Sequence, residues 1–169
     1  MDTLEHAIER AKAQLQLQAP RVVLTMAQTG LALVVNRLQT EGLKGRRYST
    51  SPLPKFFFRP TNAAGRDYVK RSKKPTYAGL REAQGMETRF VNLTYTGRML
   101  RSLAPVPAGV VASIFQARIV ASDAENAAKL EHNRRREGDF LAPNAAEQRE
   151  VDTYAQRELD RIIQTELNA

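Results

Sequence analysis

Proline and glycine gather in the middle of this 169-residue chain and restrict what that part can fold into. Residues 42–89 hold four of the eight prolines and five of the nine glycines. At this density the two residue types favour loops and short extended pieces over continuous helix. We therefore expect three parts: a helical arm at 1–41, a basic loop or arm region with a short helix at 42–89, and a compact α+β core at 90–169 ending in a long helix.

The positive charge lies in the same middle segment. The whole chain carries a net charge of +8, and residues 42–89 contain twelve Lys and Arg against three acidic residues. Residues 1–41 are neutral, and residues 90–169 carry ten basic and eleven acidic side chains. A concentrated excess of this kind favours polyanions, acidic partners or assembly contacts.

The composition excludes several kinds of site. The chain has no cysteine, which excludes disulfides, thiolate metal ligands and cysteine nucleophiles, and only two histidines. We expect no membrane-spanning helix, because no run of about eighteen apolar residues occurs. The N-terminus is acidic and amphipathic, unlike a secretory signal. We expect no enzyme activity and no cofactor, since no phosphate-binding glycine loop or cofactor motif is present.

Two stretches of the arm show apolar residues at helical spacing. Pro20 lies between them, where it either interrupts one helix or begins a second. Residues 31–35 are apolar nearly all round, so we expect the second stretch to be buried on more than one side, within one subunit or between subunits. We expect this second helical stretch to end at Gly42, because glycine commonly follows the last residue of a helix.

Aromatic and basic residues alternate through the middle segment. Phe56, Phe57 and Phe58 follow two prolines and suggest an extended segment that packs on the core or serves at an edge or interface. Residues 65–74 form the densest basic patch, interleaved with tyrosine as in some nucleic-acid binders. No zinc finger, ribonucleoprotein signature or helix-turn-helix pattern accompanies the patch, so a protein-docking or solvated surface is the alternative.

The remaining residues predict alternating short elements. A short helix is expected at 76–83, a half-buried strand at 91–95, a helical turn at 97–103, a turn at 105–109 and a strand at 110–119. Ser122 with Glu125, and Asn144 with Glu147, resemble capping boxes that open two further helices, the first ended by Gly138. The predicted class is α+β: a long N-terminal helical arm, a small antiparallel sheet with a hairpin, and C-terminal helices packed on it.

Catalytic and metal sites find little support among the residues. Asp123, Glu131 and His132 could suggest a metal site, but Asp123 and Glu131 are eight residues apart on one predicted helix, which is too far for a single ion. The Ser49–Ser51 segment has no base nearby in sequence. We expect no catalytic, cofactor-binding or metal-binding residue. A hydrolase without recognisable residues is the weakest of the function classes.

The C-terminal half resembles the tail-completion or neck proteins of long-tailed bacteriophages, also called minor tail or virion morphogenesis proteins. The resemblance lies first in residues 92–103, NLTYTGRMLRSL, and then in residues 126–132, NAAKLEH. Residues 138–143, GDFLAP, stand where the family has a glycine and an Arg-Pro-Phe-Leu turn, and the Arg-Pro pair is missing. The similarity covers roughly residues 76–167.

This resemblance implies a structural subunit without an active site. It implies a ring of six or twelve identical subunits in the virion, assembled in the host cytoplasm, between the head connector and the tail. The expected neighbours are connector, tail terminator or tail tube proteins, with packaged DNA close by and no membrane. The alternative is a nucleic-acid-binding accessory protein that uses residues 44–74. The candidate partner or subunit interface comprises Val34, Arg46, Arg47, Phe56, Phe57, Phe58, Lys70, Arg71, Lys73 and Lys74.

Overall fold

The computed structural model describes residues 4–94, 96–111 and 114–168. The chain divides into two compact units, which are described separately below. Unit 1 comprises Met1–Val35 and Arg101–Ala169, and unit 2 comprises Asn36–Leu100. The structure confirms the expected α+β class, with a long N-terminal helix, a two-stranded antiparallel sheet and C-terminal helices.

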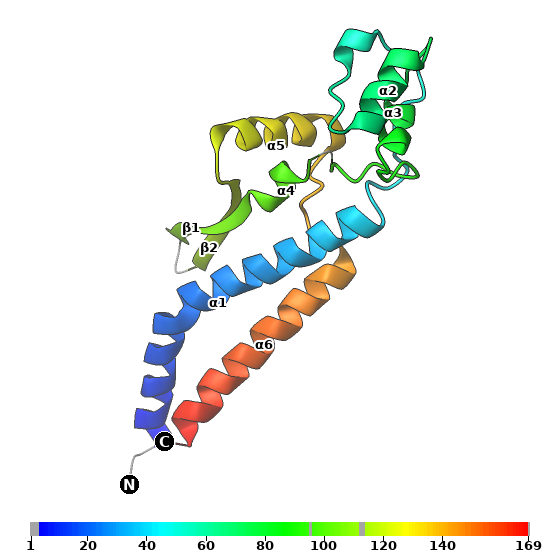
Figure 1. Cartoon of the computed structure of the whole chain (residues 1–169). Helices are drawn as coiled ribbons and strands as arrows, with labels where there is room; N and C mark the ends of the chain where they lie inside the picture. Colours follow the sequence, from blue (N-terminus) through cyan, green and yellow to red (C-terminus); the bar gives the residue numbers. More distant parts are fainter. Residues whose placement is uncertain (1–3, 95, 112–113, 169) are drawn as a thin grey trace. The chain divides into compact units, whose positions relative to one another are not determined.

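A long helix, α1 (Leu4–Thr40), begins unit 1, and its last five residues belong to unit 2. Pro20 neither ends this helix nor starts another, so the expectation of two stretches is wrong. The proline removes one main-chain hydrogen bond from the helix interior and bends it. Figure 1 shows α1 changing direction in its N-terminal half, the half that contains Pro20.

The last helix, α6 (Ala145–Leu167), runs beside α1 (Figure 1). Arg10 donates to the carbonyl oxygen of Glu166 at 3.2 Å, and Gly30 lies against Val151, so the two helices are antiparallel. The expected capping box of α6 is confirmed: Asn144 accepts from the amide of Glu147, and the Glu147 carboxylate accepts from the amide of Asn144. Val151 and Ile162 are buried on the α6 face.

The sheet consists of a single hairpin, β1 (Leu103–Val111) paired with β2 (Ile114–Ala121). Pro105 and Pro107 lie within β1, so the turn expected at 105–109 is wrong. As an edge strand, β1 has a free side on which prolines cost no ladder bond. The strand expected at 110–119 is split between β1 and β2, and its residues 112 and 113 lie outside the described part.

The helix α5 (Ala124–Glu137) packs against β2 and ends before Gly138, as expected. Its cap differs from the expected pair of Ser122 and Glu125. Asp123 is the N-cap, and its carboxylate accepts from both the main-chain and the side-chain nitrogen of Asn126. A carboxylate suits this position because it also faces the positive end of the helix dipole.

Unit 2 contains a 3-10 turn, η1 (Lys55–Phe57), and the helices α2 (Ala63–Arg71), α3 (Tyr77–Ala83) and, at its border, α4 (Arg98–Arg101). The short helix expected at 76–83 and the helical turn expected at 97–103 are confirmed. The basic patch expected in a loop lies largely on α2, where Asn62 caps the helix by accepting from the amide of Gly65. The aromatic run expected to be extended begins in η1.

The strand expected at 91–95 does not form. Val91 and Asn92 are both buried, which breaks the expected alternation, and Leu93 has a φ of 54°, in the left-handed region. The amide of Val91 instead donates to the carbonyl oxygen of Arg46. Tyr95, the third expected apolar position, lies outside the described residues.

Candidate interaction surface

Unit 2 is the basic part of the molecule. Asn36–Leu100 holds fourteen Lys and Arg against four Asp and Glu, whereas the rest of the chain holds twelve against fourteen. Unit 2 therefore carries a net charge of +10, and unit 1 carries −2. Charge of one sign at this density attracts a partner of opposite sign and steers its approach.

The basic end of α2 and the aromatic run are fixed to each other by main-chain contacts. The Lys55 ammonium donates to the carbonyl oxygen of Lys70 at 2.7 Å, and the amide of Leu53 donates to the carbonyl oxygen of Pro75 at 2.9 Å. These bonds hold η1 beside the end of α2. Cations at a helix C-terminus are favourable, because they face the negative end of its dipole. Four exposed cations lie at or just after that end: Lys70, Arg71, Lys73 and Lys74.

Two of the three phenylalanines are on the surface. Phe56 and Phe57, here called the phenylalanine pair, are 70% and 61% exposed, and their ring centroids are 4.5 Å apart at an interplanar angle of 31°. Phe58 is 5% exposed and anchors the run in the core. Burying one such side chain is worth about 1.5–3 kcal/mol, so an exposed aromatic pair is a natural contact for a partner.

A buried arginine organises the other side of unit 2. Arg81, on α3, is 1% exposed. Its Nε donates to the carbonyl oxygen of Glu87 at 2.9 Å, and its Nη1 donates to that of Thr94 at 2.7 Å. Its Nη2 reaches Asn92 Oδ1 at 3.3 Å, and its guanidinium carbon lies 4.0 Å from the centre of the Tyr48 ring. We call these residues the Arg81 cluster. It closes the loop at 86–94 onto α3.

Tyr48 and Asn92 complete that arrangement. The Tyr48 hydroxyl donates to Asn92 Oδ1 at 2.8 Å, and the amide of Asn92 lies 3.2 Å from the same hydroxyl oxygen. Burial raises the pKa of Tyr48 above 10.0, against the opposing charge of Arg81. The guanidinium, the tyrosine hydroxyl and Asn92 Oδ1 are thus joined to one another and to the main chain of the loop, which holds the loop in place.

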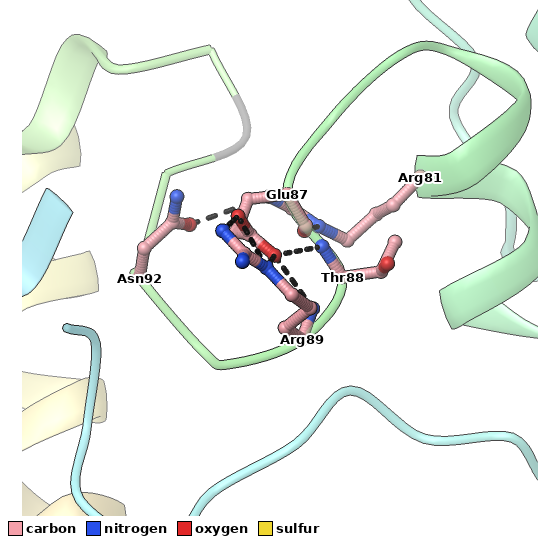
Figure 2. Close-up of polar contacts among 5 residues, drawn as sticks. All are labelled: Arg81, Glu87, Thr88, Arg89 and Asn92. Carbon is pink, nitrogen blue, oxygen red and sulfur yellow. Dashed lines mark hydrogen bonds and ion pairs between the residues drawn. The ribbon is translucent and has the colours of Figure 1, made fainter. Parts of the chain in front are cut away.

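The first residues of the same loop form an ion pair between a partly exposed Glu87 and an exposed Arg89. The Glu87 carboxylate accepts from the Arg89 side chain, with Nη2 at 2.9 Å from Oε2, and from the amides of Thr88 and Arg89 (Figure 2). The Arg89 side chain and the two amides lower the pKa of Glu87 from 4.5 to about 2. Figure 2 shows the Arg81 side chain reaching this loop from α3, whereas Arg89 belongs to the loop itself.

Unit 1 contains an apolar pocket of about 260 Å³ between α1, β2 and the start of α6. Its walls include Met26 and Leu31 from α1, Ile119 from β2, and Leu141 and Val151 near α6. Gln148 is the polar side chain at its edge and donates to Asp152 at 2.8 Å. Val110, Val111 and Ile114 form a second apolar surface of unit 1, exposed at the end of the hairpin.

The structure separates the predicted interface residues into two groups. Arg46, Arg47, the phenylalanine pair and the four cations near the end of α2 are exposed. Val34 and Phe58 are buried within the single chain, at 1% and 5% exposure. The sequence offered no signal for Arg81 or Asn92: an arginine in a basic segment is indistinguishable from its exposed neighbours until the loop that buries it is known.

Asp123, Glu131 and His132 do not form a metal site in the part of the chain that the structure describes. Asp123 caps α5, and His132 is exposed on the same helix. Within the described ranges 4–94, 96–111 and 114–168, no group of three or more His, Cys, Asp or Glu is placed to hold a metal ion. Within the same ranges, no helix combines the length and hydropathy needed to cross a membrane.

Comparisons with protein-family models, curated proteins and solved structures find no match to this chain.

Proposed function

We propose that this chain is a structural subunit of a bacteriophage neck or tail-completion ring that joins the head connector to the tail. The observation that carries the proposal is the phenylalanine pair, which is exposed on a unit of net charge +10 while Phe58 beside it is buried. Exposed aromatic residues surrounded by charge are typical of protein contact surfaces. The resemblance of residues 92–103 and 126–132 to neck proteins suggests which assembly this surface serves.

The internal use of polar groups supports a structural role. In the Arg81 cluster, a buried cation, a tyrosine hydroxyl and an asparagine side chain form the hydrogen bonds that hold a loop. Buried polar networks of this kind fix one conformation of a segment, which is what a repeated contact between subunits requires. The loop held in this way leads directly into the segment of the resemblance.

The test is the assembly state of the purified protein. We expect light scattering to show a discrete oligomer, alone or with connector and tail proteins, rather than a monomer. In an infection, loss of the chain should leave filled capsids without tails, with DNA packaging intact. A chain that stays monomeric with every neck protein, or a deletion that blocks packaging, would contradict the proposal.

A nucleic-acid-binding role is the second candidate, because the phenylalanine pair lies beside the cations at the end of α2. Proteins that bind single strands combine stacking rings with basic grooves in this manner. A dedicated binder with six or more phosphate contacts should lose about a thousandfold in affinity between about 50 and 200 mM salt, yet still bind at the upper end.

Replacing Lys70, Arg71, Lys73 and Lys74 with Gln separates the two roles. A neck subunit should show negligible DNA binding at about 200 mM salt, and the variant should fail in particle completion. Micromolar DNA binding at that salt concentration, abolished by the four changes, would support the nucleic-acid role instead. Lys129→Gln and Arg135→Gln, on the exposed side of α5, are controls that remove cations outside unit 2.

A further inference from the structure

Each copy of the chain presents an apolar projection on unit 2 and an apolar pocket on unit 1. We propose that the phenylalanine pair of one copy inserts into the pocket of a second copy. The proposal deepens the proposed ring function and rests on it for its biological setting. Three observations carry it: the size of the pocket, the chemistry of its walls and the charges around both surfaces.

The pocket has room for a phenyl ring. An apolar cavity of about 150 Å³ accepts benzene in a protein interior, and this pocket measures about 260 Å³. Its walls are aliphatic side chains and methionine, which make favourable contacts with an aromatic face or edge. The Gln148 amide nitrogen already donates to Asp152, so a ring that enters the pocket does not have to break that bond.

The charges around the two surfaces are of opposite sign. Lys55 and Arg59 flank the phenylalanine pair, and the basic end of α2 lies next to it. The pocket touches the first two turns of α6, where Glu147, Glu150 and Asp152 stand against Arg149, and Asp152 is hydrogen-bonded to Gln148 of the pocket lining. A second copy approaching with its pocket is therefore attracted to unit 2. The exposed residues of the hairpin end have no comparable cluster of cations, so the pair is the better match.

The contact joins two different surfaces of the same chain. Contacts of this type are heterologous, and they generate a closed ring when the rotation between neighbouring copies closes. One contact per copy then repeats around the ring, with each subunit giving its phenylalanine pair to one neighbour and receiving a pair from the other. Symmetric pairing of two identical patches would stop at a dimer instead.

The absence of cysteine from the sequence allows a direct test by cross-linking. Phe56→Cys leaves Phe57 in place as the inserting ring, and Gln148→Cys puts a thiol at the pocket edge. We expect a disulfide-linked pair of chains when the two single-cysteine variants are mixed and oxidised. Adding Phe57→Ala to the Phe56→Cys variant should lower the yield about tenfold or more, the loss expected when one phenyl ring is no longer buried.

Two further single-cysteine variants act as matched controls. Gln156→Cys is exposed on α6 two turns beyond the pocket, and Val110→Cys labels the end of the hairpin. A cross-link between Phe56→Cys and Gln156→Cys in equal yield, or one between Val110→Cys and Gln148→Cys in its place, would overturn the proposed contact. The absence of any cross-link would overturn it as well. In a thiol-labelling experiment, protection of Phe56→Cys by an oligonucleotide but not by excess unmodified chain would also overturn it.

The failures of the contact and of the ring are distinguishable. Oligomers seen by light scattering without the Phe56–Gln148 cross-link would reject the contact and leave the ring function standing. The expected cross-link in open-ended chains of copies, with no closed species of fixed mass, would support the contact and reject the ring.

Discussion

Replacing Arg81 with alanine tests whether the buried guanidinium holds the loop at 86–94. The two short bonds from Arg81, to the carbonyl oxygens of Glu87 and Thr94, are 2.9 and 2.7 Å long. Hydrogen bonds to charged groups contribute about 1.5–3 kcal/mol each. Their loss is partly offset because the arginine no longer has to be desolvated. We expect Arg81→Ala to lower the free energy of unfolding by about 3 kcal/mol.

Arg89→Ala is the matched control, because Arg89 belongs to the same loop but its side chain lies on the surface. Its side chain is 81% exposed and pairs with Glu87. Exposed ion pairs contribute little, so we expect the control to unfold as the unmodified protein does. Urea unfolding followed by circular dichroism measures both variants. Arg81→Lys should resemble Arg81→Ala, because an ammonium cannot reproduce the planar fork that reaches separate acceptors.

Hydrogen exchange adds a local measure of the same effect. The amides of Asn92 and Thr94 are bonded to Tyr48 and to the Asn92 side chain, so their exchange reports on the loop directly. A loss of about 3 kcal/mol corresponds to exchange about a hundredfold faster. Equal stability of the Arg81→Ala and Arg89→Ala variants, or unchanged exchange in this loop, would refute the reasoning.

Three further predictions use matched changes. The pKa of Glu87 is lowered from 4.5 to about 2, so its carboxylate stabilises the fold above about pH 4.5 and loses this effect as the pH falls toward 2. In Glu87→Gln, the free energy of unfolding should therefore depend less on pH between about 4.5 and 2. Gly42→Ala should lower the melting temperature more than Gly45→Ala does. Both glycines have positive φ, but only at Gly42 would an added Cβ collide with an aromatic ring, that of Phe90. Equal melting temperatures would contradict the steric argument. Phe58→Ala should cost about 3–5 kcal/mol and Phe57→Ala less than about 0.5 in urea unfolding of the dilute protein, and reversed values would contradict their burial.

Periodicity and caps predicted most of the helices because these signals are local. Asn144 with Glu147, and Gly138 after its helix, act within one turn of chain and were recognised correctly. Pro20 was the exception. A proline only weakens a helix, and packing of α1 against α6 compensates for the lost bond. Sequence alone does not reveal that compensation.

The extended segments were predicted less well because their structure depends on distant partners. Val91 and Leu93 have the spacing of a strand, but among the described residues no strand pairs with them. Arg81 and Tyr48 instead bond the polar groups nearby. The two prolines of β1 predicted a turn, because the sequence does not reveal that they lie on an edge strand, where prolines are tolerated. The surface charge of the candidate site could be predicted, whereas the burial of Phe58 beside two exposed rings could not.

The two prolines of β1 also determine how the hairpin can extend. Pro105 and Pro107 are two positions apart, so their nitrogens point to the same side, and the ladder with β2 runs through both positions. The outer edge of β1 therefore lacks two amide donors, whereas β2 has no proline at any position. The prolines therefore disfavour the addition of a strand along β1 and leave β2 as the edge with its full set of amide donors. If two hairpins paired along β2, both outer edges of the resulting four-stranded sheet would carry prolines, which disfavour further growth of the sheet.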